Sequence, residues 1–176
     1  MTVLAKPSDK THKSFALVLR GGGARCLSHA GVLRALISRG YVPSAIVGVS
    51  MGAVVGATYA LNDDWFDALV AMDTSGFPAT PGFRLPGLAA RMRGLRTALL
   101  AARDMYFGWG VGTPTETWGR SVLSSLTQGK NLENGRIPIF VCATDMLTGK
   151  RVVFGKGNAT DYIYASAALA GVLPPL

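Results

Sequence analysis

Short apolar runs alternate with segments of helical periodicity in the first third of the chain. Residues 15–19 (FALVL) and 45–49 (AIVGV) have the length and composition of buried strands. Residues 27–39 repeat apolar side chains near the helical period before Gly40, and residues 51–61 are rich enough in alanine and valine for a buried helix. This β-α-β-α order predicts a parallel sheet, because parallel strands need a crossover connection between them.

The pattern is less regular after residue 62. A short helix is expected near residues 64–72, and a second helical face is formed by Leu88, Met92, Leu95, Leu99 and Ala102, with arginines beside it. This arginine-flanked helix has three interpretations: a cap over a cleft, a surface that contacts lipid, or an ordinary half-buried helix. The sequence does not choose among them.

Two strands and one further helix are expected in the last third. Thr113, Pro114 and Glu116 mark the start of a helix that runs to about residue 126. Residues 137–143 (IPIFVCA) and 151–154 (RVVF) have strand composition and are joined through a turn at Thr148-Gly149.

Residues 41–61 carry no charge over 21 positions, which is long enough for a transmembrane helix. Pro43 at the start and a β-branched run that ends at a glycine-flanked serine favour a buried strand followed by a helix. The first 13 residues lack the apolar stretch of a secretory signal, and two cysteines are too few for a disulfide framework. We therefore expect a cytoplasmic protein with a flexible tail at residues 1–13 and one domain at residues 14–176.

The net charge of +8 favours anionic partners. Basic and aromatic residues do not interleave as they do in single-strand binding modules, and no zinc-finger or basic-zipper spacing is present. We therefore expect no nucleic acid as a partner, and instead peripheral contact with an anionic membrane, at its inner face.

Residues 48–52 (GVSMG) form a G-x-S-x-G pentapeptide at the junction of an expected strand and an expected helix. A sharp turn there would leave no space for side chains at Gly48 and Gly52 and would let the Ser50 hydroxyl project into a cleft. The helix that begins at Met51 adds backbone donors for a developing oxyanion. The alternative is a turn in which small residues serve only packing.

Residues 19–25 (LRGGGAR) also lie between a strand and a helix. Gly21, Gly22 and Gly23 allow backbone N–H groups to turn toward one anion. A dinucleotide-binding fingerprint would place its third glycine at Cys26, and the Gly-Lys-Ser/Thr ending of a phosphate loop is absent. An oxyanion hole is the better interpretation.

Together the two motifs resemble those of the patatin-like phospholipases, in which G-G-G-x-R/K and G-x-S-x-G stand about 25 residues apart, as residues 21–25 and 48–52 do here. Residues 29–33, 143–149 and 165–175 are similar to the bacterial branch of that family. The resemblance implies a three-layer α/β/α fold with a central, mostly parallel sheet and helices on both faces. It also implies hydrolysis of acyl esters of phospholipids or related lipids, of the lipase or phospholipase A type.

The resemblance further implies a catalytic dyad of serine and aspartate. Ser50 would attack the ester carbonyl after an aspartate, acting as general base, has activated it. Backbone N–H groups of Gly22, Gly23 and Met51 would stabilise the oxyanion, within a loop that also contains Gly21 and Arg25. Water would then release the fatty acid, and the scheme requires no metal and no organic cofactor.

In the family the aspartate lies in a D-G-G/A motif shortly after the residues that match Pro174 and Pro175, whereas this chain ends at Leu176. We therefore expect a domain that is incomplete at its C-terminus, with an unpaired strand edge and exposed apolar surface. The alternative is a non-catalytic lipid-binding or regulatory protein that keeps the pocket and lacks the base.

Four other residues near the motifs have less specific roles. Asp145 stands at a strand end, but the matching aspartate of the family belongs to a turn and is not the base. His29 is expected to be packed or hydrogen-bonded, and Cys26 to be a packed thiol. Arg25 either holds the glycine loop or attracts an anionic head group, and the sequence leaves both open.

Overall fold

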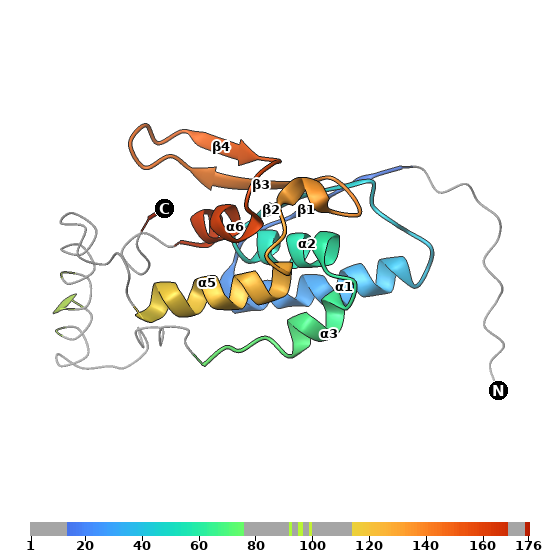
Figure 1. The fold of residues 1–176 in the computed structure, drawn as a ribbon, viewed down its shortest axis with the longest axis horizontal. Helices are drawn as coiled ribbons and strands as arrows, with labels where there is room; N and C mark the ends of the chain where they lie inside the picture. Colours follow the sequence, from blue (N-terminus) through green and yellow to red (C-terminus); the bar gives the residue numbers. More distant parts are fainter. Residues whose placement is uncertain (1–13, 76–91, 93–94, 97–98, 100–113, 169–174) are drawn as a thin grey trace.

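The computed structural model describes residues 14–75, 92, 95–96, 99, 114–168 and 175–176 (Figure 1). Its sheet has the strand order β1 (Ala16–Leu19), β2 (Ala45–Val49), β3 (Ile139–Thr144) and β4 (Arg151–Phe154). The first three strands are parallel, and β4 is antiparallel to β3. The helices are η1 (Gly23–Leu27), α1 (Ser28–Ile37), α2 (Met51–Leu61), α3 (Trp65–Val70), α5 (Pro114–Thr127), η2 (Leu132–Asn134) and α6 (Ala159–Ala167).

Each of these strands was expected from the sequence, as were α1, α2, α3 and α5. The uncharged segment at residues 41–61 forms β2 and the 11-residue helix α2. In the part of the chain that the structure describes, none of the helices combines the length and hydropathy needed to span a bilayer. Of the arginine-flanked segment, only residues 92, 95, 96 and 99 are described, and they are helical. The expected tail at residues 1–13 lies outside the described residues.

Helix α2 forms the centre of the core, and all of its residues are buried. It lies directly on the sheet at Gly56, where an added Cβ would be 2.7 Å from Ile46 Cγ2 and 3.2 Å from Ile139 Cδ1. Because close packing of this kind leaves no free space between the helix and the sheet, the start of α2 is fixed relative to the ends of β1 and β2. That start is where the expected nucleophile lies.

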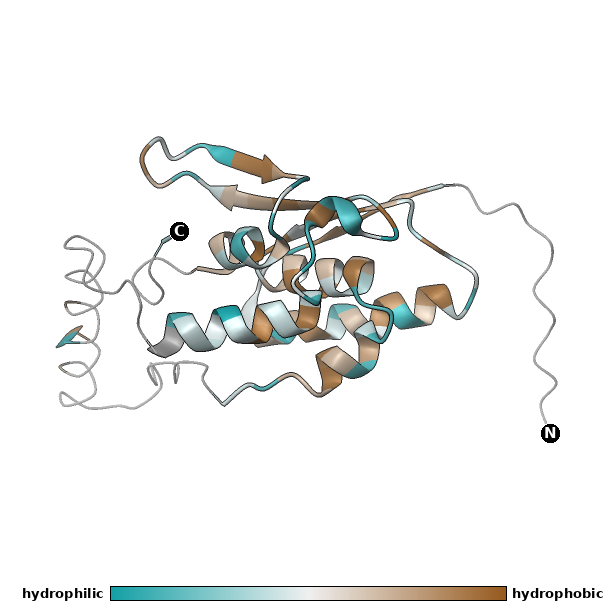
Figure 2. Cartoon of the chain, in the orientation of Figure 1, coloured by the Kyte–Doolittle hydropathy of each residue, from teal (hydrophilic) through white to brown (hydrophobic). Residues whose placement is uncertain are grey.

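The two faces of the sheet are covered unequally. Residues that face α2, such as Leu19, Ile46 and Val141, are buried, whereas Val18 and Val153 on the opposite face are 70% and 49% exposed. The described helices lie on one side of the sheet, and the strands are largely apolar (Figures 1 and 2). The α/β fold with a mostly parallel sheet is confirmed, and the described helices lie on one side of it, with α2 and α6 against the strands and α1, α3 and α5 packed on those two helices.

Helix α6 was not expected from the sequence, and polar contacts tie it to α5. Its N-cap is Asn158, whose side chain accepts a hydrogen bond from the Asp161 N–H at 3.2 Å. Arg120 of α5 donates to Asp161 at 2.5 Å and to Glu116 at 3.1 Å. The Thr127 and Thr160 hydroxyls lie 3.3 Å apart. These contacts orient α6, so that its C-terminal end reaches the carboxyl edge of the sheet.

Candidate active site

Ser50 lies between the last residue of β2 and the first residue of α2, in a backbone conformation that L-residues rarely adopt. Its φ is 53° and its ψ is −127°. A non-glycine residue held in such a region costs on the order of 1–3 kcal/mol and persists only where the surrounding structure imposes it. The strained turn therefore marks Ser50 as a candidate for chemistry.

The glycines on either side of Ser50 have no space for a side chain. A Cβ on Gly48 would lie 2.7 Å from Ala53 N and 2.8 Å from the Gly52 carbonyl oxygen. A Cβ on Gly52 would lie 2.6 Å from the Arg20 carbonyl oxygen and would overlap that of Leu19. Real Cβ atoms do not approach backbone atoms this closely, so the tight turn depends on glycine at both positions.

The structure brings the glycine loop beside Ser50. Strands β1 and β2 are parallel neighbours with Leu19 opposite Gly48, so the segments that follow them meet at the same edge of the sheet. A Cβ on Gly21 would lie 3.1 Å from Ser50 Cβ and 3.8 Å from Ser50 Oγ. Gly23 has φ 61°, a left-handed conformation that favours glycine. The loop thus places its backbone close to the serine hydroxyl.

Two side chains from the helices that follow the glycine loop, Cys26 of η1 and His29 of α1, contact that loop. Cys26 is 2% exposed, and its Sγ lies 2.8 Å from where a Cβ on Gly22 would be, so the thiol is packed as expected. His29 Nε2 lies 3.3 Å from the Arg20 carbonyl oxygen, which accepts a hydrogen bond from the Nε2–H tautomer. Both residues support the loop from the start of the first helical segment. Arg25 is exposed in η1, and Met51 is buried at the start of α2.

A hydroxyl from α6, which sequence reasoning missed, supports the strained turn. The Ser50 N–H donates to Ser166 Oγ at 2.8 Å, and the Ser166 hydroxyl donates to the Cys142 carbonyl oxygen of β3 at 2.5 Å. One side chain thus links the turn after β2 to the neighbouring strand. The family resemblance includes the Ala165-Ser166 pair, but it gave Ser166 no role.

Replacing Ser166 with alanine should lower the free energy of unfolding by about 1–3 kcal/mol, because the part-buried Ser50 N–H loses its acceptor. Ser166→Thr keeps a hydroxyl and should recover part of the loss. Urea unfolding measures both variants. Ser125→Ala, at an exposed position of α5, serves as the control and should change stability by less than about 0.5 kcal/mol. Equal stability of the Ser166→Ala and Ser125→Ala variants would show that the hydrogen bond does not support the turn.

Asp145 is occupied by its own turn. Its carboxylate accepts hydrogen bonds from the Thr148 hydroxyl at 2.7 Å and from the Leu147 N–H at 2.9 Å. The Thr148 hydroxyl, and then the Leu147 N–H, lower the pKa of Asp145 below its ordinary value. A general base at neutral pH needs a pKa nearer to 7 and a free lone pair directed at its substrate. Asp145 therefore anchors the turn between β3 and β4.

The described residues place the Ser50 hydroxyl beside the backbone of the glycine loop, and they leave the general base unassigned. Within residues 14–75 and 114–168, no hydrogen bond joins the Ser50 hydroxyl to a carboxylate or to a histidine.

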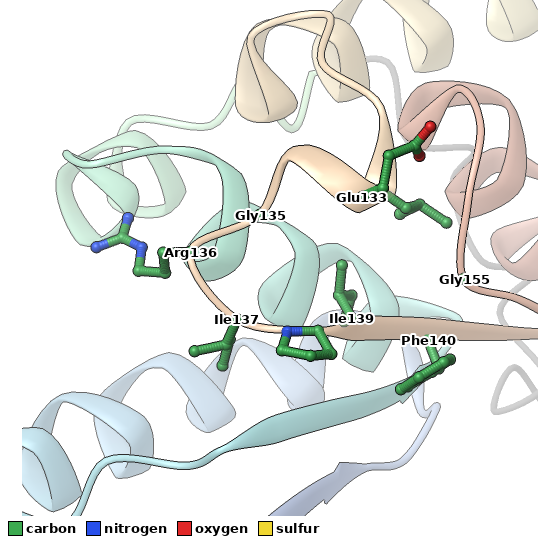
Figure 3. Close-up of a pocket in the computed structure, with 9 residues that line it drawn as sticks. Glu133, Gly135, Arg136, Ile137, Ile139, Phe140 and Gly155 are labelled. Carbon is green, nitrogen blue, oxygen red and sulfur yellow. The ribbon is translucent and has the colours of Figure 1, made fainter.

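A hollow of about 280 Å³ lies around the start of β3 (Figure 3). It is lined by residues 132, 133, 135–140 and 155. Ile139, at the start of β3, pairs with Ile46 near the start of β2, whereas Ser50 follows the end of β2. The hollow therefore opens at the amino end of β3, and Ser50 is not among the residues that line it.

Comparison with known proteins gives one family over most of the chain. Residues 17–176 match the patatin-like phospholipase family. The chain is 32% identical over 164 residues to lysophospholipase NTE1 of Mycosarcoma maydis, covering 93% of this chain and 8% of that protein. It is 29% identical over 166 residues to an uncharacterised NTE family protein of Mycobacterium tuberculosis, covering 93% of this chain and 24% of that protein.

A mammalian relative and one solved structure are also similar. Patatin-like phospholipase domain-containing protein 7 of Mus musculus is 28% identical over 166 residues, covering 94% of this chain and 11% of that protein. The crystal structure of type III effector protein ExoU superposes with a TM-score of 0.49 at 15% identity, covering 90% of this chain and 41% of that one. The chain thus spans less than a quarter of each of these curated relatives. Because they come from fungi, bacteria and a mammal, the bacterial branch stays a prediction.

Proposed function

Because the chain belongs to the patatin-like phospholipase family, we propose that it is the nucleophile-bearing part of a serine acyl hydrolase that cleaves acyl esters of phospholipids or lysophospholipids. The observation that carries this proposal is Ser50, held at φ 53° between two glycines and beside a glycine loop. The names of the curated relatives, lysophospholipase and phospholipase, support the same class of substrate.

In this proposal Ser50 Oγ attacks the ester carbonyl while its proton passes to the base. The base then donates that proton to the leaving oxygen, and the lysolipid or alcohol departs as the acyl-enzyme forms. The carbonyl oxygen becomes an oxyanion at the N-terminal end of α2. Backbone N–H groups of Gly22, Gly23 and Met51 stabilise it, Gly21 keeps the loop close to Ser50, and Arg25 lies at the outer end of that loop. Water then attacks the acyl-enzyme and releases the fatty acid.

The base in this scheme is an aspartate of the family's D-G-G/A type, which forms a dyad with Ser50. The low pKa and occupied carboxylate of Asp145 support a base from elsewhere. No side chain of the described residues is assigned the role. The proposal includes this dyad. It also includes a domain that extends from residue 14 to residue 176 and a flexible tail before that domain.

The proposed partner surface is the cytoplasmic face of an anionic membrane. The charge of +8 supports it, because cationic residues gain about 1 kcal/mol each near such a surface. Exposed apolar side chains on the arginine-flanked segment, Met92, Leu95 and Leu99, support a role of that segment in lipid contact. The contact is peripheral, and nucleic acid is not a proposed partner.

The second candidate is a non-catalytic lipid-binding protein. The specific observation in its favour is the Ser50 hydroxyl, which has no hydrogen bond to a base among the described residues. Both candidates bind lipid, so only product formation separates them.

Release of fatty acid from radiolabelled lysophosphatidylcholine and phosphatidylcholine tests the proposal. The 176-residue chain and the protein with any residues that follow Leu176 are compared. We expect the longer form to release fatty acid and the 176-residue chain to release little or none, because the proposal takes its base from a D-G-G/A aspartate and assigns none of the described residues that role. Lipid binding by the longer form with no release would favour the non-catalytic candidate. Release by the 176-residue chain would place the base within it and return Asp145 to consideration.

A further inference from the structure

The loop between β3 and β4, residues 145–150, carries two adjacent apolar side chains at its tip. Leu147 is 97% exposed and Met146 is 57% exposed. Figure 2 shows this loop apolar at its outer bend and polar on both sides. Turn residues are normally polar or glycine, because those residues form turns most easily. Single exposed apolar residues are common, so the geometry and charge around the tip decide its meaning.

The polar groups of the loop bond to one another. The Asp145 N–H donates to the Lys150 carbonyl at 2.9 Å, and the Gly149 N–H donates to the Asp145 carbonyl at 2.8 Å. The Asp145 carboxylate accepts from the Leu147 N–H and the Thr148 hydroxyl. Moving this tip into a less polar medium would thus leave few backbone donors without a partner, which is the main cost of such a transfer.

The tip projects from the edge of the sheet at which Ser50 lies. Strands β2 and β3 are parallel with Val49 opposite Cys142, so Ser50 stands level with Ala143. Asp145 is two residues further on, or about 7 Å beyond that level at the rise of a strand. Figure 1 shows the loop extending past the sheet on the side where α6 ends, and Ser166 near that end contacts Ser50. The tip and Ser50 therefore lie at the same edge of the sheet.

The same edge is cationic. Lys150 and Arg151, on the β4 side of the loop, are exposed, and neither takes part in an ion pair within the described residues. Arg20 and Arg25, which follow β1 at this edge, are also exposed. The acid of the tip, Asp145, directs its carboxylate into its own turn. Apolar side chains beside cations match the boundary between anionic headgroups and acyl chains.

We propose that the β3–β4 tip is a membrane-insertion element. Met146 and Leu147 enter the headgroup–acyl boundary of an anionic bilayer, while Lys150 and Arg151 stay at the level of the phosphates. The insertion holds the Ser50 edge of the sheet against the lipid. This inference rests on the proposed function in that it gives the serine access to its substrate. It concerns binding, however, and can be measured without turnover.

Sedimentation with sucrose-loaded vesicles tests the insertion, in the protein with any residues that follow Leu176. Equal mixtures of phosphatidylglycerol and phosphatidylcholine are compared with phosphatidylcholine alone. The double variant Met146→Ser/Leu147→Ser should lower the partition coefficient for anionic vesicles by about tenfold or more, since two apolar side chains no longer leave water. Lys150→Gln/Arg151→Gln should also lower the partition coefficient for anionic vesicles by about tenfold or more. Added salt should abolish the difference between the parent and this variant. Val70→Ser, at a 71% exposed valine of α3, is the matched control and should bind as the parent does.

A second measurement follows the tip directly. In a Leu147→Trp variant, the emission of the added tryptophan is obtained by subtracting the fluorescence spectrum of the parent. Its maximum should shift to shorter wavelength on anionic vesicles and should not shift on neutral ones. Parent-like binding by the Met146→Ser/Leu147→Ser variant, or an unshifted Leu147→Trp spectrum, would overturn the proposal. So would a parent that binds no vesicles, which would leave the tip as a contact for another protein. Turnover of a soluble short-chain ester, which needs no membrane, reports separately on the proposed function, and the tip variants should leave it unchanged.

Discussion

Replacing Ser50 with alanine should lower kcat/KM for a short-chain p-nitrophenyl ester by about a thousandfold or more, in a form of the protein that turns the ester over. The variant keeps the glycine loop and the start of α2, but no oxygen remains to form the acyl-enzyme. Initial rates from nitrophenolate absorbance measure the effect. Ser125→Ala, at an exposed position of α5, is the matched control and should retain parental turnover. Turnover of the same size in both variants would remove Ser50 from the mechanism.

A glycine at the same position separates strain from chemistry. Ser50→Gly should also abolish turnover, yet it should raise the free energy of unfolding by about 1 kcal/mol. The reason is that glycine adopts φ 53° and ψ −127° without the steric cost that serine bears. Urea unfolding of Ser50→Gly and Ser50→Ala measures the difference. If the two variants are equally stable, the turn at Ser50 does not store strain.

Gly52→Ala should lower the free energy of unfolding by about 1–3 kcal/mol and should also lower turnover. The added methyl group would overlap the Leu19 carbonyl oxygen and lie 2.6 Å from that of Arg20. Both obstacles are backbone atoms at the end of β1, so the strand or the start of α2 has to move. The displacement would also separate the glycine loop from Ser50, and turnover should fall with stability.

Gly31→Ala provides the matched control for that substitution. Gly31 lies within α1, and a Cβ there would meet no atom within 4 Å. Because alanine is the better helix former, Gly31→Ala should raise the free energy of unfolding by up to about 1 kcal/mol. Thermal and urea unfolding of both variants test the contrast. Stabilisation by both substitutions would contradict the close approach of α2 to β1.

The order of strands and helices was readable from the sequence because local patterns determine it. Residues 45–49 and 51–61 became β2 and α2 with the expected bounds, and their continuous apolar character reflects burial within the core. The glycines around Ser50 were readable for the same reason, since a strand-to-helix turn needs small residues locally.

Features that depend on distant contacts were not readable in this way. The hydrogen bond between Ser50 and Ser166 joins residues 116 positions apart, and no local pattern encodes it. Helix α6 carried a local signal that was missed, since Asn158 and Asp161 have the spacing of an N-cap and the third helical residue. The sequence indicated a turn at Thr148-Gly149, but the exposure of Leu147 depends on what surrounds the turn in space.

The most direct test of Ser50 as the nucleophile is mass spectrometry after reaction with a fluorophosphonate, which forms a stable bond to an activated serine. The protein with any residues that follow Leu176 should gain one adduct. Trypsin should place it in the peptide of residues 40–84, and fragmentation should assign it to Ser50 and not to Ser44 or Ser75. The Ser50→Ala variant should gain none. An adduct on another residue, or no adduct in the parent, would contradict the assignment of Ser50 as the nucleophile.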